Sequence, residues 1–242
     1  MAEEREKKIY TSFHEIPPRE YMYFPKGTLE PGKPGKFSRI EIVHLLISIF
    51  VLTIAFAFAL TNNNMIYGFG NFKLLPLGIA MSFLGILTAF FFHELSHKFM
   101  AQRYGLWSEF RMYPMGLLLA FLLAIFTGFV FAAPGAVMFR GDSRNFETGR
   151  IAVAGPLSNL LIAFITFPLY LFVFFEISTL RTIVGFICLI NAFLATFNLL
   201  PIGPLDGAKV IRWNPTVWII LFSMAIAMTM YIFLKVPLIT TF

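Results

Sequence analysis

Residues 74–104 read LLPLGIAMSFLGILTAFFFHELSHKFMAQRY, and the membrane character of the chain is plainest here. The first nineteen of them, residues 74–92, include no charged side chain. A helix of that length covers about 28 Å, close to the thickness of a hydrocarbon core. The polar run that begins at His93 is therefore expected at, or just inside, one membrane boundary. An ionisable residue at that depth is energetically costly, so its presence indicates a functional site.

The composition of the chain also indicates a membrane protein. Of its 242 residues, 58% are hydrophobic and 13% are charged, with a mean hydropathy of +0.76. Soluble domains are roughly 45–50% apolar and about 25% charged, so this composition excludes a water-soluble globule. The single cysteine, Cys188, excludes a disulfide scaffold. The net charge of +6 is not arranged as a basic stripe with aromatic residues between, so no nucleic-acid partner is expected.

Apolar runs of membrane-spanning length predict the fold class. We expect an all-α polytopic membrane protein with five to six transmembrane helices, embedded in the lipid bilayer. The predicted spans are 42–60, 74–92 with a more polar continuation to 104, 151–175, 183–200 and 217–234.

The positions of Lys and Arg orient these spans. Eight of the 19 basic residues fall in 1–40 and six in 98–150, whereas 61–73 holds only Lys73. Cytoplasmic loops carry the excess of basic residues, so 1–40, 98–150 and 201–215 are expected on the cytoplasmic side. We therefore predict a multi-pass protein of the cell membrane with a cytoplasmic N-terminus. Residues 1–40 form the predicted Pro/Gly-rich arm, with a short strand possible at 21–24 and no cleavable signal peptide.

This orientation decides the role of a further apolar run, residues 115–133. Because both ends of 98–150 lie on one side, the run must enter the membrane and return. Pro114, Gly128 and Pro134 supply the necessary breaks. We predict a re-entrant hairpin or short β element over about 108–140, packed against the helices because irregular backbone at membrane depth must be covered. The alternative is a true sixth span, which would reverse the membrane orientation of every segment after it.

The run His93-Glu94-Leu95-Ser96-His97 carries the chemistry. Two histidines four residues apart project from one face of a helix and can bring two imidazoles to one metal ion. Glu94 between them is placed to act as a general base on a metal-bound water. The alternative is a helix end whose polar residues meet the interface. Lys or Arg would be the usual residues there, which favours the metal site.

A catalytic zinc site takes three protein ligands, and Asp206 is the predicted third. It follows the fifth span, on the same side as His93 and His97, in the run Asn-Leu-Leu-Pro-Ile-Gly-Pro-Leu-Asp-Gly at 198–207. A helix-capping role for Asp206 is the alternative. His14, His44 and Cys188 are weaker candidates. Two imidazoles and one carboxylate favour Zn²⁺.

Three asparagines are placed to make polar contacts inside the bundle. Asn159, at the end of Ala-Gly-Pro-Leu-Ser-Asn (154–159), could donate to the oxyanion of a tetrahedral intermediate or form an interhelical hydrogen bond. Asn191 and Asn198 share one face of the fifth span. We expect them to link helices, with Asn198 able to brace the loop that leads to Asp206.

These motifs, in this order, resemble those of the site-2 proteases, a family of intramembrane zinc metalloproteases. The resemblance covers about 93–212, and it implies a membrane protease domain at 41–242 with its core at 74–212. It also implies that His93, His97 and Asp206 bind zinc, that Glu94 is the catalytic base and that Asn159 contacts substrate or oxyanion. Residues 131–139 fall where the family places an extended segment that helps to hold the substrate as a strand.

The expected activity is hydrolysis of a peptide bond in or near a substrate transmembrane helix, close to the cytosolic face. A membrane-spanning protein is the expected substrate, and Glu94 is expected to activate the water on zinc. Two alternatives stay open at this point. One is a non-proteolytic membrane metal-binding protein or transporter, which would not need Glu94 as a base. The other is a catalytically dead relative that only binds membrane proteins.

Overall fold

The computed structural model describes residues 36–61, 72–130, 134–140, 143–173 and 177–235. Five helices in these residues are long and apolar enough to cross a membrane. They run over Arg39–Leu60, Phe72–Arg103, Asn145–Val173, Thr179–Asn198 and Pro215–Leu234, and each overlaps a predicted span. The prediction of an all-helical multi-pass membrane protein is confirmed. The predicted arm and its possible strand lie almost entirely outside the described residues.

Two of these spans contain π turns. The second begins as a 3₁₀ turn and passes through a π turn before its last segment, in the order η2 (Phe72–Leu74), α2 (Leu75–Ile86), η3 (Leu87–Phe91) and α3 (Phe92–Arg103). The third is α5 (Asn145–Pro168), extended by the π turn η4 (Leu169–Val173). A π turn widens a helix locally and is frequent at functional sites. The turn η3 ends directly before the segment that carries His93.

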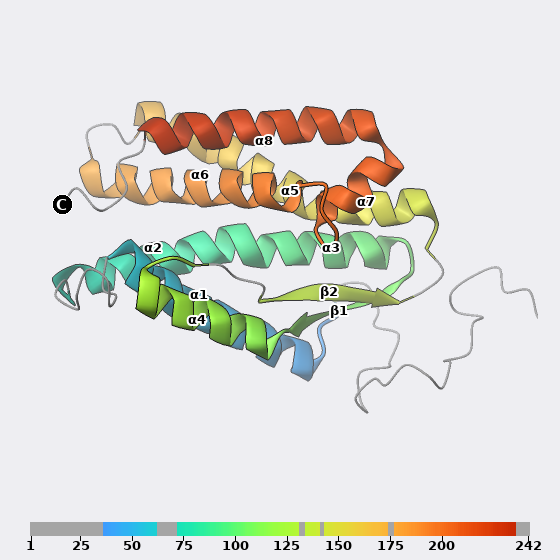
Figure 1. The fold of residues 1–242 in the computed structure, drawn as a ribbon, viewed down its shortest axis with the longest axis horizontal. Helices are drawn as coiled ribbons and strands as arrows, with labels where there is room; N and C mark the ends of the chain where they lie inside the picture. Colours follow the sequence, from blue (N-terminus) through green and yellow to red (C-terminus); the bar gives the residue numbers. More distant parts are fainter. Residues whose placement is uncertain (1–35, 62–71, 131–133, 141–142, 174–176, 236–242) are drawn as a thin grey trace, which may run out of the picture.

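The second span is the centre of the bundle. On one side it packs against α1 (Arg39–Leu60), and on the other against α5 and α6 (Ser178–Asn198). The short helix α7 (Asp206–Trp213) packs on α5, and α8 (Pro215–Lys235) packs on α6. In Figure 1 the end of α3, the start of α5 and α7 lie together at one end of the bundle. That end also holds the two strands.

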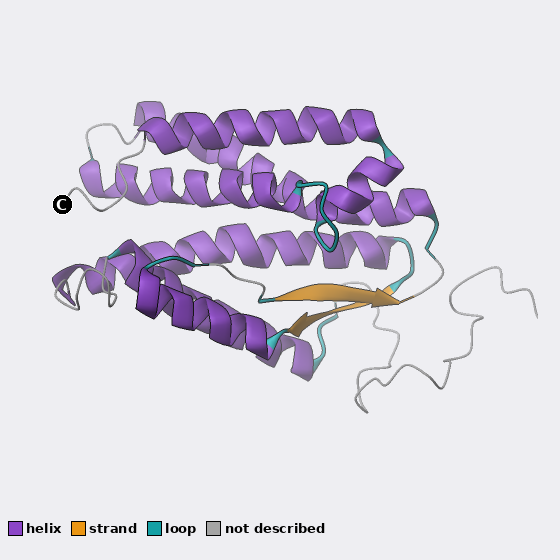
Figure 2. Cartoon of the chain, viewed as in Figure 1, coloured by secondary structure: helices purple, strands orange, loops and turns teal. Residues whose placement is uncertain are grey.

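The predicted re-entrant region consists of a strand, one helix and a second strand. Strand β1 (Trp107–Met112) is followed by α4 (Pro114–Thr127) and by β2 (Gly135–Arg140), and the two strands pair antiparallel with Met112 opposite Gly135 (Figure 2). At 14 residues α4 is about 21 Å long, which is too short to span a hydrocarbon core. Because β1 and β2 lie side by side, the chain enters and returns to the same end.

The way the chain returns differs from the predicted hairpin. The apolar run folds as one helix, which Gly128 ends in the left-handed conformation with φ 72°. Residues 128–134 then lead back to β2, and 131–133 among them lie outside the described residues. Pro134 still contributes to the sheet, because its carbonyl accepts a hydrogen bond from the Tyr113 amide at 2.9 Å.

Small side chains fill the contacts between helices, and large apolar side chains face outward. Fully buried alanines occur on most of the helices, at positions Ala55, Ala57, Ala120, Ala124, Ala163, Ala192, Ala195 and Ala225. Phe50, Ile165 and Phe172 are instead 64–78% exposed on the outer surface. In lipid an exposed apolar side chain carries no hydrophobic penalty, and small residues let helices approach closely. The bundle therefore has the packing pattern of a protein surrounded by lipid.

Candidate metal centre

The first two turns of α3 bring the two predicted histidines together. His93 and His97 are both buried, and their Nε2 atoms lie 3.0 Å apart. Their rings meet edge to face with centroids 4.6 Å apart. The four-residue spacing on a helix therefore places both ring nitrogens at one point, as predicted.

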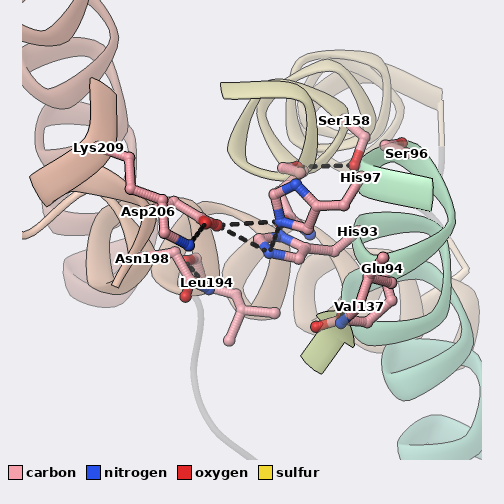
Figure 3. A network of polar contacts seen from close by, with 12 residues as sticks. His93, Glu94, Ser96, His97, Val137, Ser158, Leu194, Asn198, Asp206 and Lys209 are labelled. Atoms are coloured by element: carbon pink, nitrogen blue, oxygen red, sulfur yellow. Dashed lines mark hydrogen bonds and ion pairs between the residues drawn. The ribbon is translucent and has the colours of Figure 1, made fainter. Parts of the chain in front are cut away.

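Asp206 reaches the same point from another part of the chain. It is the first residue of α7, and its Oδ2 atom lies 3.0 Å from Nε2 of His97 and 3.4 Å from Nε2 of His93. Figure 3 shows the carboxylate facing the two rings across the site. One ligand atom from each of the three residues lies within 4.8 Å of the others. Such a set of two imidazoles and one carboxylate could hold zinc and leave a coordination position open.

The second nitrogen of each imidazole has an oxygen partner, and this fixes the tautomer. Nδ1 of His93 lies 2.5 Å from Oδ1 of Asn159, and Nδ1 of His97 lies 2.7 Å from the Ile151 carbonyl oxygen. Both partners accept hydrogen bonds, so each Nδ1 must carry the proton. In the neutral form of each ring, which is the form that binds metal, the lone pair is then on Nε2, facing Asp206. This is the arrangement that metal-binding histidines show in proteins.

Space for an ion depends on Gly155 of α5. A Cβ atom at this position would lie 2.6 Å from Nε2 of His93 and would also overlap Nε2 of His97. No side chain larger than hydrogen fits between α5 and the two nitrogens. The helix α5 therefore forms one wall of the site and supplies no side chain to fill it.

The charge of Asp206 suits a metal ligand. Burial works to raise the pKa of its carboxyl, but His97 and His93, when they carry a second proton, outweigh burial and hold that pKa below its ordinary value. Lys209, one turn further along α7, places its Nζ atom 3.4 Å from Oδ1 of Asp206. The carboxylate is therefore ionised at neutral pH, as a metal ligand must be.

Glu94 is buried on the neighbouring face of α3 and is turned toward the sheet. Its Oε2 atom accepts a hydrogen bond of 2.9 Å from the backbone amide of Val137 in β2 (Figure 3). The predicted base is thus connected to the strand on which a substrate was expected to lie. The sequence did not reveal this contact, because the Val137 amide is a backbone group without a side-chain signature.

Asn159 lies between three helical segments. Its side chain is fully buried, and its amide nitrogen donates to the Ala89 carbonyl in η3 at 2.8 Å and to Oδ1 of Asn191 in α6 at 3.0 Å. Both amide hydrogens are therefore already donated, and the oxygen faces His93. This geometry favours the interhelical role of Asn159. A role as oxyanion donor would require one of these bonds to break.

Other candidates lie away from the centre or bond locally. Cys188 is buried in α6, where its thiol donates to the Ala163 carbonyl at 3.3 Å. His44 lies in α1 with Nδ1 3.5 Å from the Met112 amide nitrogen. The Asn198 amide donates to the Leu194 carbonyl in its own helix at 3.1 Å. His14 lies outside the described residues.

Comparisons with known proteins identify relatives of this chain. Residues 174–229 match the model of peptidase family M50. A Methanocaldococcus jannaschii protein with a provisional zinc metalloprotease name is 45% identical over 186 residues, which cover 76% of this chain and 90% of the relative. A Bacillus subtilis protein with the same provisional name is 31% identical over 149 residues, covering 52% of this chain and 65% of the relative.

A second M. jannaschii protein, named a zinc metalloprotease, is 28% identical over 139 residues, covering 55% of this chain and 34% of the relative. No solved structure matches the chain. The first of these relatives is similar along nearly its whole length, and the three names agree on the metal and on the activity. The chain therefore belongs to peptidase family M50, the site-2 protease family, and is a membrane-embedded zinc metallopeptidase.

Proposed function

We propose that this metallopeptidase cleaves a peptide bond in or near a transmembrane helix of a membrane-protein substrate, close to the cytosolic face. The observation that carries the proposal is the position of the three candidate zinc ligands, His93, His97 and Asp206. They converge inside a bundle of apolar helices, at the end of the bundle that also holds the strands and α7. We infer that substrate reaches this site from within the membrane and that water reaches it from one face.

Each residue of the site has a separate role in the proposed reaction. His93, His97 and Asp206 hold zinc, which when bound polarises the scissile carbonyl and lowers the pKa of water. Glu94 takes a proton from the attacking water and later passes it to the leaving amine. The Val137 amide holds the Glu94 carboxylate in place through its hydrogen bond of 2.9 Å. Asn159 and the Ile151 carbonyl keep the two imidazoles in the tautomer that binds metal.

A transmembrane substrate must unwind before it can be cut, because an intact helix keeps its carbonyls in its own hydrogen bonds. Strand β2 offers a surface for the unwound segment. It pairs with β1 along one edge, and along the other edge it meets Glu94 through Val137. Addition of an extended peptide to a sheet edge is a common mode of peptide recognition. The substrate strand would then pass beside the base and the metal ligands.

The cytosolic position of the site rests on the distribution of charge. Arg103, Arg144, Arg150 and Arg212 lie in segments at the end of the bundle that holds the sheet, whereas Lys73 and Arg181 lie in segments at the opposite end. Basic residues concentrate on the cytoplasmic side of membrane proteins. This supports a cytoplasmic N-terminus, because α1 begins at the end with the sheet.

A cleavage assay with purified protein tests the proposal. The substrate is a single-span protein with a helix-destabilising residue in its span, and wild type is compared with Glu94→Gln. We expect wild type to cut the substrate, and Glu94→Gln to hold the same amount of zinc without cutting it. Equal function of the two proteins in metal transport, with no cleavage by either, would instead support the transporter alternative.

A further inference from the structure

Two buried charges outside the metal centre form an ion pair inside the bundle. Glu41 of α1 and Lys98 of α3 are 0% and 1% exposed, and Nζ of Lys98 lies 2.8 Å from Oε2 of Glu41. Removing two charges from water is costly, and a well-packed apolar pair of similar size often serves stability at least as well. The presence of charge at this place therefore calls for a role that apolar side chains cannot fill.

Both side chains also bind the backbone of strand β1. Lys98 donates to the Ser108 carbonyl at 2.9 Å, and Oε1 of Glu41 accepts from the Phe110 amide at 2.9 Å. These backbone groups belong to the edge of β1 that does not face β2. Away from water, such groups need partners within the protein. The ion pair supplies one donor and one acceptor to the same strand edge.

The contact with β1 lies one helical turn from the contact with β2. Glu94 and Lys98 are four residues apart on α3, so they project from the same face. Glu94 binds the amide of Val137 in β2, and Val137 is opposite Phe110 in the sheet register. At this rung of the sheet Glu94 of α3 therefore holds β2 and Glu41 of α1 holds β1, while Lys98 of α3 holds β1 two residues away, at Ser108. The histidines that hold the metal precede Glu94 and Lys98 by one residue each.

We propose that Glu41 and Lys98 are positioning residues that fix the sheet relative to Glu94 and the metal ligands. The proposal rests on the proposed function, because it assumes that a substrate strand lies on β2. Because β1 is fixed to α1 and α3, its partner β2 is held at one position along α3, the helix that carries Glu94. A bound peptide then presents one particular bond to the centre. Neither residue touches substrate in this account, and each acts through β1.

Two double variants separate strand anchoring from packing. Glu41→Met with Lys98→Met removes both charges and both strand contacts but keeps similar side-chain volumes. Glu41→Gln with Lys98→Met is also neutral, but the glutamine oxygen can still accept from the Phe110 amide. The control is Thr196→Val with Thr229→Val, which removes a hydrogen bond of 2.9 Å between α6 and α8, away from the sheet. Each protein is measured for zinc content, thermal unfolding, kcat and KM, cleavage position by mass spectrometry and amide hydrogen exchange.

We expect all three variants to hold zinc as wild type does. For the Met/Met variant we expect a fall in kcat/KM of about 100-fold, additional cleavage positions and faster exchange in residues 107–112 and 135–140. The kcat/KM of the Gln/Met variant should lie between those of the Met/Met variant and wild type. The threonine control should have the kcat/KM, cleavage position and exchange of wild type. If the Met/Met variant does not fold, the same comparison is made between the Gln/Met variant and wild type.

A folded, zinc-loaded Met/Met variant that cuts the same single bond at a wild-type rate, with unchanged exchange in the strands, would overturn the proposal. Failure of the proposed function would give a different set of results. In that case wild type itself does not cleave, and hydrogen exchange still reports whether the pair holds the sheet. Unchanged strand exchange in the Met/Met variant would then reject the anchoring role independently of any activity.

Discussion

At the scale of single residues, the hydrogen bond from His93 to Asn159 links the metal centre to the rest of the bundle. Asn159 in turn binds the Ala89 carbonyl and Asn191, so the orientation of the His93 ring depends on three helical segments. Loss of such a partner typically lowers metal affinity by about 10–100-fold. We predict this loss of zinc affinity for Asn159→Ala, measured by competition with a chromophoric chelator.

Ser158→Ala is the matched control for that measurement. Ser158 is the neighbouring residue, and its hydroxyl donates to the Gly155 carbonyl within its own helix at 2.7 Å. Its removal should leave zinc affinity near that of wild type. Equal affinities of Asn159→Ala and wild type would show that Asn159 does not orient the ligand.

Gly155 gives a second residue-scale prediction. Alanine at this position would place its methyl group against both Nε2 atoms, in the space that an ion needs. In a helix, alanine is more favourable than glycine by about 1 kcal/mol, so the substitution should not destabilise α5 itself. We therefore expect Gly155→Ala to fold but to retain little zinc, as measured by metal analysis of the purified protein.

Gly203→Ala is the control for an added methyl group near the site. It lies in the loop before Asp206, where a Cβ atom would meet nothing within 4 Å. This variant should keep its zinc. Full zinc occupancy in Gly155→Ala would contradict the requirement for a glycine beside the two Nε2 atoms.

The sequence predicted the three candidate ligands from the spacing of one motif and from the predicted membrane side of the other. The spacing of His93 and His97 needs only a helix, and Asp206 needs only the correct side of the membrane. The Ile151 carbonyl and the Val137 amide are backbone groups, and their contacts depend on how separate segments approach one another. Glu41 and Lys98 did carry a signal, since a charge in an apolar helix is costly and indicates a partner.

At the scale of the elements, the contact between α3 and β2 is the one that relates base to substrate. The Val137 amide donates to Glu94 and not to β1. Proline at this position would remove that donor while leaving the pairing of β1 with β2 intact. A hydrogen bond to a charged group is worth about 1.5–3 kcal/mol, so we expect Val137→Pro to lower kcat/KM by about 10–100-fold with zinc retained.

Val137→Ala is its control, because alanine keeps the backbone amide and shortens only the side chain. It should cleave the substrate within a fewfold of wild type in the same assay. Equal loss in Val137→Pro and Val137→Ala would mean that the side chain of Val137 matters and that its amide does not.

The elements themselves were only partly predictable. Long apolar runs determine the five spans, because a hydrocarbon core demands helices of that length. The run 115–133 is also apolar, but its helix is too short to span the membrane. Its Pro and Gly breaks predicted a return, but nothing local shows that Pro114–Thr127 forms one helix with strands on either side. The π turn η3 likewise has no mark in the local sequence, and its Ala89 carbonyl accepts a hydrogen bond from Asn159 of another helix.

At the scale of the whole molecule, cleavage close to the cytosolic face requires that the sheet, the start of α5 and α7 share the cytoplasmic side. Cysteine labelling with an impermeant reagent tests this in intact cells. Lys73→Cys lies at the opposite end of the bundle and should react from outside, whereas Arg144→Cys should react only after lysis. The native Cys188 is fully buried, so it should contribute little background. The reverse pattern would invert the topology.

In the proposed metal centre, two imidazoles from α3 and one carboxylate from α7 hold a single zinc ion. X-ray absorption at the zinc edge, on purified wild type and on Asp206→Ala, tests this coordination most directly. We predict a wild-type spectrum with two imidazole ligands, oxygen donors and no sulfur, and a zinc content that falls strongly in Asp206→Ala. Identical zinc content and identical spectra in the two proteins, or a sulfur ligand in wild type, would contradict the account.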